Sequence, residues 1–356
     1  MKKILLFLLI FLLSGCYDYV EINNLSFISS IGIDYIDDEY IITFEILSDK
    51  KEGENASIKK ASSVTGSGKS IAEAFDNITL KIVKIPYFEH IKAVIVSEEI
   101  AKNHMQSIID YLTRNPKIRK EFFIVISTNK NAKDVLSMQN DDVPVIGNQL
   151  EKLIETGYYN YNTTYSKSFE DFLEKLLNEK MEAITTSIEI LDEKINIKGI
   201  ALFKDYNYIL TLNAFNSSLF NILNDDKANT IITKYYDDKA FSIKLFNKDI
   251  KYSFNDKNIN VNILLEGEIL ENTPNFDLRK EETYKKLEKE FNNILYDDFN
   301  NIFNILKNNK IDSLGLNNKQ YKKSKKNNKN ILDNNININI KFAIDRKGLI
   351  FKVDNE

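Results

Sequence analysis

The stretch LSFISSIGID, residues 25–34, has the apolar spacing of a β-strand. The stretch YIITFEIL, residues 40–47, has the same character and follows an acidic turn around residues 37–39. The two stretches therefore predict a pair of strands joined by that turn. The order of the elements that follow this pair indicates the class of the fold.

Strand and helix patterns alternate after this pair, and Ser70 is placed to cap the first helix. This alternation predicts a sheet covered by helices, with some crossover connections. The expected strands are residues 62–65, 91–96 and 122–127, and the expected helices are residues 71–83, 98–114 and 132–138.

The second half of the chain contains a predicted hairpin, residues 183–191 and 195–203, which residues 208–212 extend. Three further strands are expected to be antiparallel, and a last strand ends the pattern. These strands are residues 230–236, 240–246, 260–270 and 336–344, and the expected helices are residues 149–156, 168–180 and 215–223.

The clearest single element is a helix over residues 278–307, because its apolar residues form one stripe at helical spacing. Asp277 is expected to be its N-cap, and Glu281 and Glu282 suit the positive end of a helix dipole. Such a stripe is typical of a face that packs on a sheet, and binding of a partner is the alternative.

The composition limits the classes of protein to which this chain can belong. The chain has 356 residues, of which 43% are hydrophobic and 28% are charged, as in folded globular proteins. Its 48 basic and 52 acidic residues leave it slightly acidic, which argues against a nucleic-acid binder. One cysteine excludes an internal disulfide, and two histidines exclude most zinc sites.

The N-terminal sequence MKKILLFLLIFLLSG, residues 1–15, has the pattern of a signal peptide. Two lysines precede an apolar run that is too short to cross a bilayer, which needs about 20 residues. The next residues, Leu13-Ser14-Gly15-Cys16, resemble the bacterial lipobox. We expect cleavage before Cys16 and attachment of a diacylglyceryl group to its thiol, which gives two acyl chains and a stable anchor.

The alternatives are an ordinary secretory signal with a chance cysteine, or an uncleaved anchor. An A-x-A-like cleavage site is missing, and Cys16 is the only cysteine of the chain. Both observations favour lipidation. No later stretch has the apolar length of a membrane span, so we expect a folded body tethered at Cys16.

The sequence Gly66-Ser67-Gly68-Lys69-Ser70 is the strongest enzyme-like signal. A phosphate-binding loop of the G-x-x-x-x-G-K-S type also needs glycine at position 63, where this chain has Ser63. A turn containing the two glycines and a helix cap at Ser70 explain the same residues.

Other catalytic patterns are equally weak. His90 and His104 lie outside any H-E-x-x-H pattern, and a structural role is favoured for His90. Pairs of adjacent aspartates recur, but without the spacing of a calcium loop, and nothing selects a catalytic pair among them.

Residues 317–330, NNKQYKKSKKNNKN, are expected to form a polar, basic loop. Its lysine cluster at residues 322–326 is interpreted as solvated, with contact to an anionic membrane surface as the alternative.

Several stretches together resemble the Ger(x)C family of spore germination proteins, the lipoprotein C subunits of nutrient germinant receptors. The chain has no tryptophan, and Tyr17 stands where the family often has one. The matching stretches are CYDYVEI (16–22), IGID (31–34), SGKSIAEA (67–74), HIKAVIV (90–96), YLTRNP (111–116), AKDVL (132–136), KGIALFK (198–204) and DSLG (312–315).

The resemblance implies an α+β protein of three domains after a cleaved signal peptide of residues 1–15. Each domain would be a mostly antiparallel or mixed sheet flanked by helices, over residues 16–145, 146–212 and 213–356. A lipid on Cys16 would hold the protein on the outer face of the spore inner membrane. There it would assemble with two membrane-embedded subunits, of the A and B types, in a complex that responds to small nutrients.

The resemblance implies no catalytic residue, cofactor, metal or nucleic-acid partner. One alternative is a solute-binding lipoprotein that captures the nutrient itself between two lobes. The other is a lipoprotein hydrolase acting on the cell wall, which would need a carboxylate pair or a metal site inside a groove.

Overall fold

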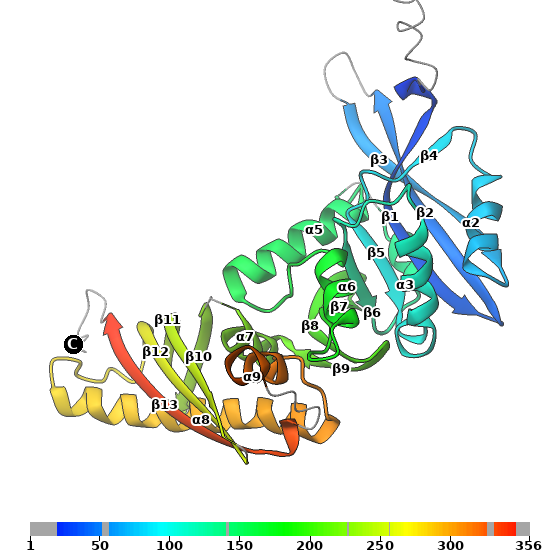
Figure 1. Ribbon diagram of the computed structural model, residues 1–356. Helices are drawn as coiled ribbons and strands as arrows, with labels where there is room; N and C mark the ends of the chain where they lie inside the picture. The colour runs from blue at the N-terminus through cyan, green and yellow to red at the C-terminus, as the bar shows by residue number, and fades with distance from the viewer. Residues whose placement is uncertain are drawn as a thin grey trace, which may run out of the picture.

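The computed structural model describes residues 20–51, 57–139, 142–225, 228–255, 257–325 and 331–346. The expected signal peptide and Cys16 lie outside these residues. The described residues form a nine-stranded sheet and a four-stranded sheet, each covered by helices (Figure 1). The α+β class predicted from the sequence, with mixed sheets flanked by helices, is confirmed.

The larger sheet has the order β3-β2-β1-β5-β6-β7-β8-β9, and β4 pairs with β1 beside this path. The neighbours β1, β5, β6 and β7 are parallel, whereas the outer pairs are antiparallel. Its strands are β1 (Leu25–Ile36), β2 (Glu39–Lys51), β3 (Ser57–Gly68), β4 (Ile85–Tyr87), β5 (Ala93–Ser97), β6 (Phe123–Ser127), β7 (Ile184–Leu191), β8 (Lys194–Lys204) and β9 (Asn207–Asn213).

Helices cover both faces of this sheet. Successive side chains of a strand point to opposite faces, so one strand contributes to two cores. Val94 and Val96 pack in the core beneath α2, α3 and α6, whereas Ala93 and Ile95 pack in a second core beneath α4 and α5. These helices are α2 (Ile71–Thr79), α3 (Met105–Arg114), α4 (Ala132–Leu136), α5 (Ile146–Thr156) and α6 (Phe169–Leu177).

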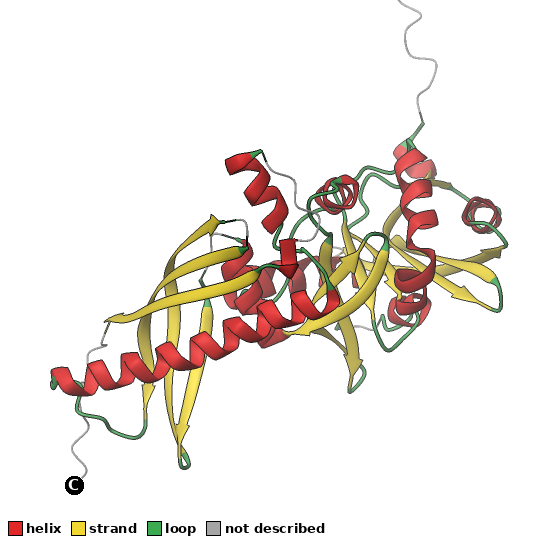
Figure 2. Ribbon diagram, turned by 60° about the horizontal axis from the view of Figure 1, so that its bottom comes forward, coloured by secondary structure: helices red, strands yellow, loops and turns green. Residues whose placement is uncertain are grey.

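The smaller sheet has the order β10-β11-β12-β13. Helix α8 connects β12 to the parallel strand β13 and runs along one face of the sheet (Figure 2). Its apolar stripe, including Phe291, Leu295 and Phe299, is buried in this core, so the predicted packing is confirmed. The elements are α7 (Ala214–Asn224), β10 (Thr230–Tyr236), β11 (Lys239–Phe254), β12 (Asn258–Asn272), α8 (Glu281–Asn309), α9 (Leu316–Ser324) and β13 (Asn335–Arg346).

One apolar core joins the two sheets. Ile184 and Leu202 of the larger sheet belong to the same buried cluster as Phe220 of α7 and Phe303 of α8. The larger sheet is also continuous across residue 145, because β6 pairs with β7. These two observations do not by themselves define domains. The expected domain boundaries at residues 145 and 212 stay predictions.

Three local predictions were wrong in the bounds or the type of an element. The long helix begins at Glu281 with Lys280 as N-cap, because Asp277 instead accepts a hydrogen bond from Arg279 Nε at 2.8 Å. Residues 317–324 are helical rather than a loop, because Asp312 caps α9 and Leu316, Asn317 and Gln320 are buried. The expected helix over residues 71–83 is shorter and ends at Thr79.

Gly199 occupies a position that no other residue fits. Its φ is +145°, and a Cβ there would lie 2.0 Å from the carbonyl oxygen of Leu212. The adjacent Ser217 Oγ accepts from the amide of Ile200 at 2.8 Å and donates to Leu212 O at 3.0 Å. This contact fastens the start of α7 to the larger sheet.

We expect Gly199→Ala to lower the free energy of unfolding by at least about 3 kcal/mol, through backbone strain and overpacking. The matched control is Gly315→Ala, at φ +61° with the nearest atom 3.4 Å from a Cβ. The control should lose only about 1–2 kcal/mol, the cost of a left-handed alanine. Urea unfolding followed by circular dichroism measures both, and equal losses would contradict the contact at Leu212.

Candidate functional site

Two family-like stretches that lie far apart in the sequence meet at the start of α4. Asp34, from IGID, accepts hydrogen bonds from the backbone amides of Ala132 at 2.7 Å and Lys133 at 2.9 Å, both from AKDVL. Gly32 lies under the same helix, where a Cβ would be 3.1–3.2 Å from Leu136 and Ala132. Burial raises the pKa of Asp34, and the two backbone hydrogen bonds counteract this rise. These residues therefore hold α4 to the sheet.

Glu45 on β2 does the same for α5. Its Oε1 accepts from the amide of Ile146 at 2.5 Å, and its Oε2 accepts from Gly147 at 2.9 Å. The side chain is fully buried, and burial raises its pKa against the effect of these amides. Sequence reasoning missed Glu45, although a single acidic residue inside the apolar stretch YIITFEIL was the available signal.

A third, half-buried carboxylate, Asp312 of DSLG, accepts from the amides of Leu316 at 2.7 Å and Asn317 at 2.8 Å at the start of α9. Burial raises the pKa of Asp312 to about 7 and lowers that of the neighbouring Lys319 to about 8. Lys319 Nζ donates to the carbonyl oxygen of Leu314. These groups serve the packing of α9.

The glycine-rich stretch is a helix cap. A Cβ at Gly66 or Gly68 would lie 2.6 Å from Ile78 N or 2.7 Å from Ala74 N, so both glycines allow α2 to approach β3. Ser70 Oγ accepts from the amide of Glu73, whose carboxylate accepts in turn from the amide of Lys69. Ser70 therefore caps α2, as the structural interpretation of the sequence predicted.

The histidines lie apart in aromatic surroundings. His104 stacks on Tyr35 with ring centroids 3.9 Å apart, and His90 lies 5.7 Å from the rings of Phe27 and Tyr87. Within the described ranges, no group of three or more His, Cys, Asp or Glu side chains is placed to hold a metal ion.

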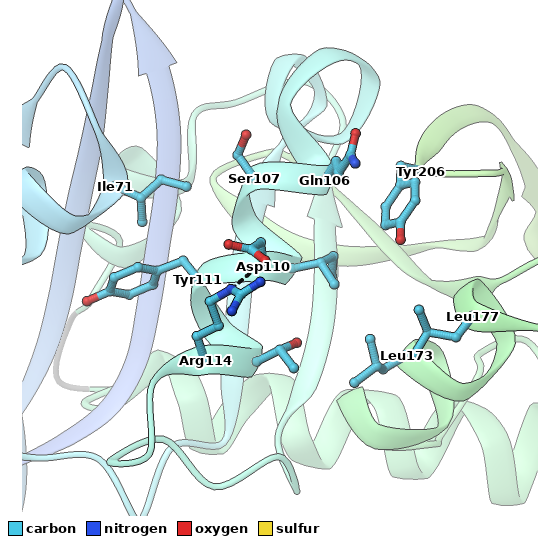
Figure 3. Close-up of a pocket in the computed structure, with 11 residues that line it drawn as sticks. Ile71, Gln106, Ser107, Asp110, Tyr111, Arg114, Leu173, Leu177 and Tyr206 are labelled. Atoms are coloured by element: carbon cyan, nitrogen blue, oxygen red, sulfur yellow. Dashed lines mark hydrogen bonds and ion pairs between the residues drawn. The ribbon is translucent and has the colours of Figure 1, made fainter.

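An open groove of about 580 Å³ lies around α3, and we call it the α3 groove (Figure 3). Ile71 and Tyr111 lie on one side of α3, and Leu173, Leu177 and Tyr206 lie on the other.

The YLTRNP stretch contributes part of the groove's wall, including Arg114. Arg114 Nε donates to Asp110 Oδ1 at 2.7 Å, and both side chains are exposed. A groove with apolar walls and one exposed ion pair is suited to recognising another chain. Sequence reasoning found YLTRNP but missed Leu177 and Tyr206, which come from elements far along the chain.

Among the helices in the described part of the chain, none combines the length and the apolar character needed to cross a bilayer.

Comparison with known protein families shows to which family this chain belongs. Residues 18–190 match the family described as "Spore germination protein N-terminal domain", and residues 198–348 match "Spore germination B3/ GerAC like, C-terminal". The chain belongs to the Ger(x)C family of spore germination proteins. The two matches cover almost all of the described residues, including the three carboxylate caps and the α3 groove.

Individual relatives agree with this membership. "Spore germination protein KC" of Bacillus subtilis is 23% identical over 354 residues, covering 90% of this chain and 86% of the relative. "Spore germination protein A3" of the same organism is 24% identical, covering 76% and 74%. The crystal structure of the GerBC protein has a TM-score of 0.56 at 15% identity, over 88% of this chain and 96% of that one, so the two share a fold.

We expect Asp34→Ala to lower the free energy of unfolding by about 2–4 kcal/mol, because two buried amides lose their acceptor. Asp134→Ala is the matched control, since Asp134 is exposed in the first turn of the same helix. Its loss should not exceed about 1 kcal/mol, the size of a helix-dipole contribution. Urea unfolding compares the two, and similar losses would show that Asp34 is not the cap that holds α4.

Proposed function

We propose that this protein is a lipid-anchored, non-enzymatic subunit of a spore nutrient germinant receptor, assembling with membrane-embedded subunits of the A and B types. The observation that carries this proposal is the match of both Ger(x)C regions, the first of which starts at residue 18, two residues after Cys16. Cys16 would anchor the chain on the outer face of the spore inner membrane, and the complex would trigger germination in response to a small nutrient.

The described side chains support a non-enzymatic role. The carboxylates of Asp34, Glu45 and Asp312 each accept hydrogen bonds from two backbone amides of a helix. A carboxylate engaged in this way maintains the fold. Direct capture of a nutrient would require a cleft enclosed by two lobes, whereas the α3 groove lies open on the helical face of the larger sheet.

The anchor also explains how a groove of modest size could hold a partner. Tethering confines both proteins to one thin layer, which raises their effective concentration without any new contact. We propose that the α3 groove receives a segment of a partner subunit. Leu177, 65% exposed at the edge of the groove, is an apolar contact that the isolated chain leaves in water.

Cys16→Ala should give a folded protein that no longer fractionates with membranes, because it lacks the thiol that accepts the lipid. The measurement is membrane fractionation with a high-salt wash, in cells without the partner subunits. Ser14→Ala is the control, since it keeps a small residue in the lipobox. Retention of Cys16→Ala in the washed membranes would overturn the lipid anchor.

Leu177→Asp should reduce co-purification of the partner subunits from spore membranes at least about tenfold, the effect of losing about 1.4 kcal/mol at an interface. Leu191→Asp is the matched control, because Leu191 is 49% exposed in the β7–β8 hairpin, away from the groove. Both variants should unfold at similar urea concentrations. Equal recovery of partners with both would exclude the α3 groove as the docking site.

A further inference from the structure

Exposed apolar side chains gather at one end of the larger sheet. Leu80 is 85% exposed, Val83 is fully exposed, and Ile22 and Ile85 are 67% and 53% exposed. Val20 is also exposed. We call these five residues the apolar edge. Single exposed apolar residues are common, but a contiguous group of them marks a binding surface.

The pairing of β1 with β4 brings these residues together. The two strands are parallel, and Leu25 is paired with Ile85. Neighbouring strands lie about 4.8 Å apart. Residues 20–24, before β1, and residues 80–84, before β4, therefore lie at the same end of the sheet. Figure 1 shows the starts of β1 and β4 at one end of the molecule, with the smaller sheet at the other.

The charges beside the apolar edge suit an anionic surface. Residues 20–24 and 80–85 contain two lysines, Lys81 and Lys84, and one acidic residue, Glu21. Both lysines are exposed, and they flank Ile82 and Val83; Lys81 Nζ donates to the carbonyl oxygen of Thr65 at 2.7 Å. An apolar side chain between lysines fits the boundary between phospholipid headgroups and acyl chains, where long basic side chains remain at the headgroups.

The short segment between Cys16 and β1 indicates that the apolar edge contacts the bilayer. Val20 follows Cys16 by four residues, which span at most about 14 Å even when fully extended. A lipid on Cys16 therefore keeps the start of β1 close to the bilayer. This step rests on the lipid anchor of the proposed function.

We propose that the apolar edge docks on the phospholipid bilayer and inserts Leu80 and Val83 into the outer leaflet. The lipid on Cys16 and the 80–84 loop then make two separate contacts with the membrane. Two contacts fix the orientation of the larger sheet, whereas a single lipid tether leaves the protein free to rotate. The smaller sheet is held away from the membrane surface.

The absence of tryptophan from the chain allows a direct test, because one introduced tryptophan is the only one in the protein. The probe variant is Val83→Trp, and the matched control is Tyr235→Trp, at a 70% exposed position on β10. Each full-length lipidated protein is reconstituted in vesicles of phosphatidylglycerol and phosphatidylethanolamine with brominated acyl chains. Flotation of the vesicles measures retention, and tryptophan emission measures insertion.

We expect both variants to float with the vesicles, and the emission of Val83→Trp alone to shift to the blue and be mostly quenched by bromine. Flotation with no more quenching at position 83 than at position 235 would overturn membrane docking and leave the lipid anchor intact. Failure of both proteins to float would overturn the anchor and the docking with it. A blue shift only when other receptor subunits are present, without quenching, would assign the edge to a protein partner and overturn the proposal.

Discussion

Buried carboxylates at helix N-termini hold the covering elements of this protein to its sheets. Asp34 and Glu45, on neighbouring strands, accept from amides of α4 and α5 that are 98 to 102 residues away in the sequence. Asp312 does the same locally for α9. Each pairing satisfies amides that a helix leaves free and places a negative charge at the positive end of the helix dipole. Without these contacts, the face of the larger sheet that α4 and α5 cover would keep its apolar packing but lose the polar contacts that orient these two helices.

One apolar core is shared by the two sheets that these caps help to cover. Residues of β7, β8, α7 and α8 belong to one buried cluster, and Gly199 allows the start of α7 to approach the larger sheet closely. These buried side chains and the start of α7 therefore hold the two sheets together.

The family-like stretches have two different kinds of role. IGID, SGKSIAEA, AKDVL, KGIALFK and DSLG supply caps, tight glycine contacts and buried side chains. YLTRNP contributes exposed residues to the α3 groove. Most of the recognisable residues of this Ger(x)C protein thus maintain the scaffold, and its proposed contacts with lipid and partners involve exposed side chains such as Val83 and Leu177.

The sequence alone determined most strands and helices, because the apolar spacing of β5, β6 and α8 is strong enough to identify an element without its neighbours. It also predicted the helix cap at Ser70 and the family, whereas the lipobox at Cys16 stays a prediction. The sheet order, the caps of α4 and α5, the α3 groove and the apolar edge came only from the tertiary structure. An apolar pattern shows that a strand is buried but not which strand pairs with it, so the meeting of Leu25 with Ile85 or Asp34 with Ala132 has no local signal. Helix α9 was missed for a related reason: its Asn- and Lys-rich sequence favours a loop, and burial of Leu316 and Gln320 against the rest of the protein overrides that local preference.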